Sequence, residues 1–230
     1  MAQAFTCMMA NALGSERLDP WVQGVNASET TWDIPEWQQV CDFMDIMNQY
    51  GIANPFDSDY SNMIATFANG EAAMYGNGSW SLADVKAIDP AIKMGVMGYP
   101  VTENPDDAKL GVDIENIIAA SAKQENPEAL RKVLDYMADL DDGTGFLHLG
   151  VNNMNWTPMM PYSEHVDFGP AGDDFQNYIN KQQTMPWLYN KVPKNYLAPM
   201  SEFEQAYMMG LIDRSAFADG LTQAWLERLE

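Results

Sequence analysis

Apolar residues recur every three or four positions along most of this chain, which is the pattern of helices that bury one face. Trp37 and Trp225 fall on two of the clearest stripes, so both indoles are expected in the core. Capping residues and glycines mark where several of these helices begin and end. The predicted helices cover residues 2–13, 34–50, the segment between Asp59 and Asn69, 80–87, 126–140, 144–149, 173–183, 199–211 and 215–229.

Short apolar runs between these helices predict strands. The runs lie at residues 72–75, 92–97, 114–120 and 185–189. Residues 18–31 contain Pro20 and predict a loop, in which a further short strand could form near Trp21. Strands that alternate with helices indicate an α/β fold that is rich in helix.

The composition is that of a folded, strongly acidic protein with one large or two small domains. Hydrophobic residues make up 47% of the 230 positions, and 12 Lys and Arg against 33 Asp and Glu give a formal charge of −21. This charge excludes a nucleic-acid partner and disfavours anionic membranes, because both are bound through basic side chains. No segment has the roughly 18 uninterrupted apolar residues of a membrane span. Cys7 and Cys41 lie in apolar helical segments that favour buried free thiols, and their pairing stays open.

Sequence templates for enzymes and metal sites are absent. The chain has no nucleophile elbow, no zinc-protease motif, no phosphate-binding loop and no dinucleotide fingerprint. His148 and His165 stand apart without metal-ligand spacing. Asp113 and Glu115 could serve a carbohydrate-active hydrolase, but 33 acidic residues supply such pairs by chance. We therefore predict no catalytic residue, no metal and no cofactor, with a hydrolase as the alternative.

Three tryptophans lie in polar loops rather than on helical stripes. Trp80 follows Gly-Asn-Gly-Ser, Trp156 follows a run of asparagines, and Trp187 stands beside Pro186 and close to Tyr189. An indole face beside amides and carboxylates matches a sugar, which presents both C–H faces and hydroxyl groups. The alternative is that all these rings pack in the core of an adhesion or protein-interaction domain.

Residues 60–100 hold the most specific pattern, YSNMIATFANGEAAMYGNGSWSLADVKAIDPAIKMGVMGYP. It resembles the signature stretch of extracellular solute-binding proteins of ABC importers, in the maltose-binding-protein-like carbohydrate group. The matching positions are Phe67, Gly70, Glu71, Ala72, Ala73, Met74, Gly78 and Trp80. Weaker matches follow at residues 118–121, 126–129, 201–204 and 210–213, so the resemblance extends over nearly the whole chain.

The resemblance implies a periplasmic-binding-protein-like fold of type II, in which two α/β lobes close on a sugar. It implies a stacking role for Trp80, with Asn77 and Ser79 as neighbouring hydrogen-bond donors. Asp113 is a candidate polar contact where the chain would cross between lobes, and Trp156 and Trp187 complete the set. The implied partners are an oligosaccharide or related small polar solute and the membrane permease of an ABC importer.

The same mapping predicts how the chain is divided. Residues 1–110 and 162–230 would form the second lobe, and residues 111–161 would belong to a first lobe that is largely missing. Such a fragment would bind sugar weakly, and Ile114, Ile117 and Ile118 would form an exposed apolar surface that is open to self-association. The parent protein would be extracellular or periplasmic and anchored through a lipoprotein signal. The identity, linkage and length of the sugar stay open, as does the oligomeric state.

Overall fold

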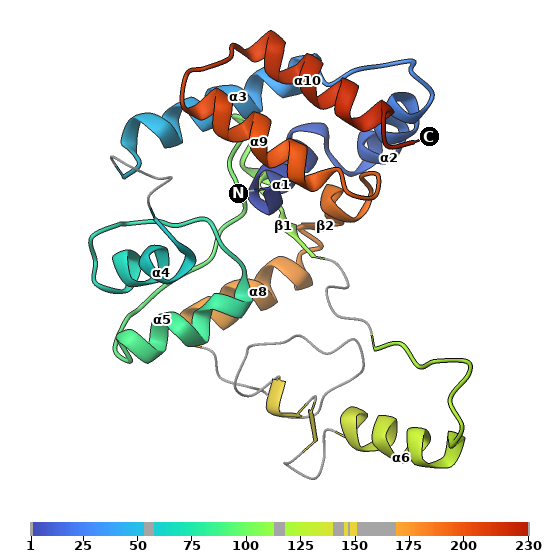
Figure 1. Ribbon diagram of the computed structural model, residues 1–230. Helices are drawn as coiled ribbons and strands as arrows, with labels where there is room; N and C mark the ends of the chain where they lie inside the picture. The colour runs from blue at the N-terminus through green and yellow to red at the C-terminus, as the bar shows by residue number, and fades with distance from the viewer. Residues whose placement is uncertain are drawn as a thin grey trace. The chain divides into compact units, whose positions relative to one another are not determined.

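A computed structural model describes residues 2–52, 58–112, 118–139, 145–146, 148–150 and 169–229 (Figure 1). The chain forms two compact units. Unit 1 combines Met1–Pro55, Val96–Asp113 and Asp174–Glu230, and unit 2 combines Phe56–Gly95 and Ile114–Asp173. Each unit is therefore built from segments that are far apart in the sequence.

Helices make up most of both units. Unit 1 contains α1 (Ala2–Leu13), α2 (Ser15–Asn26), α3 (Pro35–Tyr50), α9 (Leu197–Met208), α10 (Arg214–Leu226) and the strands β1 (Leu110–Gly111) and β2 (Thr184–Met185). Unit 2 contains α4 (Tyr60–Ala68), the 3₁₀ helix Ser79–Ser81, α5 (Leu82–Ile88) and α6 (Pro127–Ala138). Helix α8 (Pro170–Asn180) begins in unit 2 and continues into unit 1. Two further 3₁₀ helices, Pro105–Asp107 and Leu188–Asn190, lie in unit 1.

Side-chain caps explain where three of these helices begin. The carboxylates of Asp59 and Asp213 each accept a hydrogen bond of 2.8 Å from the backbone N–H three residues later, at the start of α4 and α10. Asn126 does the same for α6 at 3.0 Å, and Pro127 follows it at the first helical position. A cap of this kind satisfies one of the N–H groups that a helix start leaves unpaired. The predicted starts of these helices follow from that chemistry.

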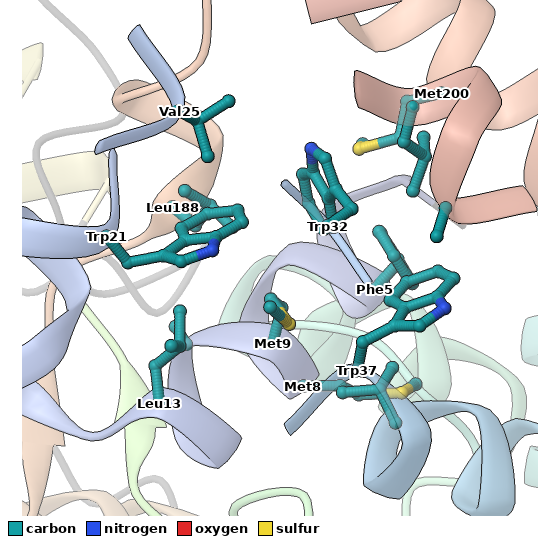
Figure 2. Packing of buried hydrophobic residues seen from close by; sticks show 14 of the residues in the cluster. Phe5, Met8, Met9, Leu13, Trp21, Val25, Trp32, Trp37, Leu188 and Met200 are labelled. Carbon is teal, nitrogen blue, oxygen red and sulfur yellow. The ribbon is translucent and has the colours of Figure 1, made fainter. Parts of the chain in front are cut away.

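The hydrophobic core of unit 1 contains a cluster of aromatic rings around Trp32, packed among aliphatic and methionine side chains (Figure 2). The Trp32 side chain is fully buried, and its ring centroid lies 4.8 Å from that of Trp21 and 5.7 Å from those of Phe5 and Trp37. Trp225 of α10 contacts the same ring at 6.1 Å. Each aromatic side chain buries roughly 150–250 Å². The cluster therefore joins α1, α2, α3 and α10, and it confirms the predicted burial of Trp37 and Trp225.

The predicted loop at residues 18–31 is wrong for most of its length, because residues Ser15–Asn26 form α2 with Pro20 inside it. A proline within a helix removes one backbone hydrogen bond and usually ends the helix. The helix persists because its apolar face, which includes Leu18 and Val25, is buried in the core of unit 1. Burial of this face in the core therefore outweighs the tendency of Pro20 to end the helix.

Most of the predicted strands do not form. Residues 72–75 and 92–97 are irregular, and Met74 is 74% exposed. Of the predicted run at 114–120, residues 118–120 are irregular and the others lie outside the described residues. In the described part of the chain, the one sheet is the parallel pair β1–β2, in which Leu110 is opposite Thr184 and Gly111 opposite Met185. The fold is thus helix-rich with a minimal parallel sheet.

The two units divide the chain differently from the predicted lobes. Residues 56–95 cluster with residues 114–173, whereas the prediction placed them with both ends of the chain. Contacts within this chain alone define the units, so the assignment of 1–110 and 162–230 to one lobe stays a prediction. Ile118 is 53% exposed, whereas Ile114 and Ile117 lie outside the described residues. Both Cys7 and Cys41 are free thiols. Among the described helices, none combines the length and apolar character that crossing a membrane requires.

Candidate functional site

The candidate site in unit 2 is loop 76–81, which lies between α4 and α5. Ser81 fixes its shape: its hydroxyl donates to the backbone oxygen of Gly78 at 2.8 Å, and its backbone N–H donates to the same oxygen at 3.1 Å. Because the single hydroxyl proton of Ser81 is used in this way, the Tyr75 hydroxyl donates to Ser81 Oγ at 2.5 Å. Ser81 is only 1% exposed. A buried hydroxyl that both donates and accepts a hydrogen bond therefore stabilises this turn.

Tyr75 is itself held from the side of α4. Its ring centroid lies 4.5 Å from that of Phe67. Burial raises the pKa of Tyr75 above its ordinary value, so the phenol stays protonated near neutral pH and remains the donor to Ser81. The loop is thus supported by α4, by the paired rings of Phe67 and Tyr75, and by the hydroxyls of Tyr75 and Ser81.

The Trp80 ring rests on the backbone of Gly78. A Cβ atom built on Gly78 would overlap the six-membered ring of Trp80, so only glycine leaves room for the indole at this place. The φ angle of Gly78 is −119°, which any residue adopts, and the requirement for glycine is therefore one of space. Trp80 is half-buried and lies outside the aromatic core, which belongs to unit 1. The ring is neither sealed in an apolar interior nor fully exposed.

Asn77 has one side-chain group engaged and one free. Its Oδ1 accepts a hydrogen bond of 2.9 Å from the Gly78 N–H. Its Nδ2 is buried and finds no acceptor among the described residues. Ser79 is half-buried and begins the 3₁₀ helix that leads into α5. Asn77, Ser79 and Trp80 therefore lie on one short loop, and their role in binding stays a prediction.

Trp187 lies in unit 1 and has a different support. A Cβ atom on Gly111 of β1 would overlap the Trp187 indole and lie 2.8 Å from Cys7 Sγ, so the ring packs directly on the β1 backbone. The Trp187 ring centroid also lies 6.1 Å from that of Tyr189 at an interplanar angle of 80°. Trp187 is half-buried, and its role as a sugar contact stays a prediction.

Two predicted site residues cannot be placed. Asp113 and Trp156 lie outside the described residues. Sequence reasoning missed Ser81 and Tyr75, whose signal is weak because a serine and a tyrosine six residues apart are ordinary in any loop. Within the described ranges, no group of three or more His, Cys, Asp or Glu side chains is arranged to hold a metal ion.

The sequence of this chain is similar to one known protein family and to a named relative. The family described as "Bacterial extracellular solute-binding protein" matches residues 2–142, which is more than half of the chain and includes the whole of loop 76–81. A relative named "Multiple sugar-binding protein", from Streptococcus mutans serotype c, is 25% identical over 115 residues. That match takes in 46% of this chain and 27% of the relative, so it spans about a quarter of the relative's length. The chain belongs to the bacterial extracellular solute-binding proteins.

Proposed function

We propose that this chain is part of the carbohydrate-binding subunit of an ABC import system, and that loop 76–81 forms one wall of the sugar site. The observation that supports this best is the placement of Trp80 on Gly78, half-buried and held by the hydrogen bonds of Ser81. A rigid indole face provides a flat apolar platform for the C–H face of a sugar ring.

The polar groups of the loop fit the same ligand. Asn77 Nδ2 is a donor with no acceptor among the described residues, and a buried donor without an acceptor costs about 1–3 kcal/mol. A sugar hydroxyl that enters beside Trp80 after a small movement of the side chain would satisfy it. The hydroxyl of Ser79 would make a second hydrogen bond to the sugar. Asp113, Trp156 and Trp187 remain proposed contacts from other segments.

The comparisons support a sugar as the solute class. The relative is named for binding multiple sugars, and members of the family are solute-binding components of transporters rather than enzymes. We therefore do not propose the hydrolase that Asp113 and Glu115 would require. We propose that the parent protein lies outside the cytoplasm, where it is anchored as a lipoprotein. Its transport partner would be a membrane permease.

The test is a titration of the ¹⁵N-labelled chain with a panel of mono- to tetrasaccharides, followed through the indole N–H signals. Trp80→Phe identifies the Trp80 signal by its disappearance. We expect this signal to shift at millimolar sugar while those of Trp32 and Trp37 stay in place. Loss of the stacked ring in Trp80→Ala should weaken binding about tenfold, which corresponds to the upper range for an aromatic contact.

Two controls make the result decisive. The first control uses amino acids and dipeptides at the same concentrations, which report binding of other polar solutes. The second is Asn77→Asp, which is nearly isosteric with asparagine and tests the amide donor. Sugar binding that leaves the Trp80 signal unmoved would contradict the proposed site. A response to dipeptides but not to sugars would contradict the solute class.

A further inference from the structure

The turn between α9 and α10 presents two large apolar side chains to solvent. Met209 is 58% exposed and Leu211 is 70% exposed. The residues that flank them, Met208 and Ile212, pack against the hydrophobic core of unit 1. The turn is thus anchored at both ends, and its two central apolar side chains project from a fixed base.

The backbone explains why Leu211 is left exposed. Gly210 has a φ angle of +70°, its N–H donates to the Tyr207 oxygen at 2.8 Å, and the Leu211 N–H donates to the Ala206 oxygen at 2.9 Å. These bonds define a Schellman motif, in which the side chain at the position of Leu211 usually covers an apolar residue in the last helical turn. That residue is Ala206 here, and its methyl group is too small to bury a leucine. Leu211 is therefore fixed in place without being covered.

Polar contacts tie the turn to the end of α3. Arg214 forms ion pairs with Asp42 at 2.7 Å and Asp45 at 2.6 Å, and Asn48 Nδ2 donates to the Met208 oxygen at 3.1 Å. A surface that is already ordered loses little conformational entropy when a partner binds it. The pair Met209 and Leu211, which we call the apolar knob, has this property.

The charge around the apolar knob limits what can bind it. Asp42, Asp45 and Asp213 against Arg214 leave a formal charge of −2 beside the knob, on a chain of −21. A second copy of this face would bring like charges together, and an anionic bilayer would be repelled in the same way. A protein surface with an apolar pocket bordered by Lys or Arg matches both the shape and the charge.

We propose that the apolar knob is a docking point for the membrane permease of the importer, inserted into an apolar pocket that basic side chains surround. The identity of this partner rests on the proposed function. The knob would supply the desolvated centre of the contact, and Asp42 and Asp45 of α3 together with Asp213, the N-cap of α10, would supply its charged rim.

In-cell photo-crosslinking tests the docking. The photoreactive residue p-benzoylphenylalanine is placed at position 211 of the full-length protein in the bacterium that makes it, and at position 229 as a control, where Leu229 is 44% exposed. We expect an adduct with a multi-span membrane protein, identified by mass spectrometry, from position 211 alone. An adduct with a second copy, the same adducts from both positions, or no membrane-protein adduct would overturn the proposal.

Transport measurements separate this proposal from the sugar site. Leu211→Asp should lower sugar uptake at least tenfold while sugar affinity and melting temperature stay unchanged, because the Leu211 side chain is 70% exposed and is not part of loop 76–81. Uptake should survive in Leu211→Met. Normal uptake by Leu211→Asp would overturn the docking role, whereas a chain that fails to bind sugar but still crosslinks to the permease would overturn only the proposed ligand.

Discussion

The two units hold tryptophan in different ways. In unit 1, Trp32 is enclosed by Tyr196 and by rings from helices α1, α2, α3 and α10, and none of its side chain reaches solvent. In unit 2, Trp80 lies on a glycine in a turn that hydrogen bonds fix locally, and it stays half-buried. Contact with other buried rings makes an indole part of the core, whereas an indole beside the backbone of a turn keeps part of its surface accessible. The same residue type therefore belongs to the core of one unit and, in the proposed function, to the ligand site of the other.

The largest expected effect is the loss of Trp32. Trp32→Ala leaves a cavity among the rings of unit 1, and aromatic truncations of this kind lower the free energy of unfolding by about 3–5 kcal/mol. Trp80→Ala should lower it by less than half as much, because its ring is half-buried. Urea unfolding of both variants checks the difference. Equal losses would mean that Trp80 is a core residue and that the comparison fails.

The core of unit 1 also contains a carboxyl group that makes its stability depend on pH. Glu204 of α9 is 4% exposed, its Oε2 accepts no hydrogen bond from a described residue, and burial raises the pKa of Glu204 from 4.5 to about 7. The folded state therefore binds a proton that the unfolded state has released between pH 4.5 and 7. Stability is highest below this window and falls by about 3 kcal/mol as pH rises through it.

Glu204→Gln should remove this fall, since the amide does not titrate. Glu202→Gln, on the same helix but exposed, is the matched control and should leave the pH profile unchanged. Melting temperatures between pH 4 and pH 9 provide the measurement. A Glu204→Gln profile that still falls between pH 5 and pH 8 would assign the pH dependence to another group. Loop 76–81 of unit 2 is held by the uncharged hydroxyls of Tyr75 and Ser81, so its stability should show no such dependence.

A double-mutant cycle tests the support of Trp80. Gly78→Ala places a methyl group where the indole lies and should destabilise unit 2 by about 1–3 kcal/mol, as overpacking does. The same change in a Trp80→Ala background should cost little, because the space is then empty. Sugar affinity should fall in Gly78→Ala, since the Trp80 indole must move away from residue 78. Additive losses in the cycle would show that the ring does not rest on Gly78.

The sequence predicted the helices well where local signals and burial agree. The stripe in α10 and the caps of α4 and α6 were sufficient, whereas α2 was missed because Pro20 marks a loop and only the tertiary core reveals the buried face of that helix. The runs at 72–75 and 92–97 were read as strands because their residues are apolar. They have no neighbouring strand among the described residues, and a strand without a partner is not stable.

The site was predicted only in part, for similar reasons. Trp80, Asn77 and Ser79 could be proposed together because they are adjacent in the sequence, and their role stays a prediction. The packing of Trp187 on Gly111 joins segments more than seventy residues apart, which no local pattern reveals. The hydrogen bond from Tyr75 to Ser81 was missed because neither residue type is rare, although the bond decides how firmly Trp80 is presented.

The smallest expected effect tests that last bond. Tyr75→Phe removes the phenol that donates to Ser81 but keeps the ring beside Phe67, so it should lower the stability of unit 2 by about 1 kcal/mol, the worth of one hydrogen bond. Ser81→Ala should cost about twice as much, because it also removes the bond to the Gly78 oxygen.

Broadening of the Trp80 indole signal in the labelled chain reports how far the loop has loosened. Broadening should be greater in Ser81→Ala than in Tyr75→Phe and absent in Thr66→Val, a change to a hydroxyl on the neighbouring helix α4 that bonds only within its own helix. If Thr66→Val broadens the signal equally, the loop depends on the general packing of unit 2 and not on the hydroxyl pair. The contrast with the ring-packed Trp32 would then be one of degree.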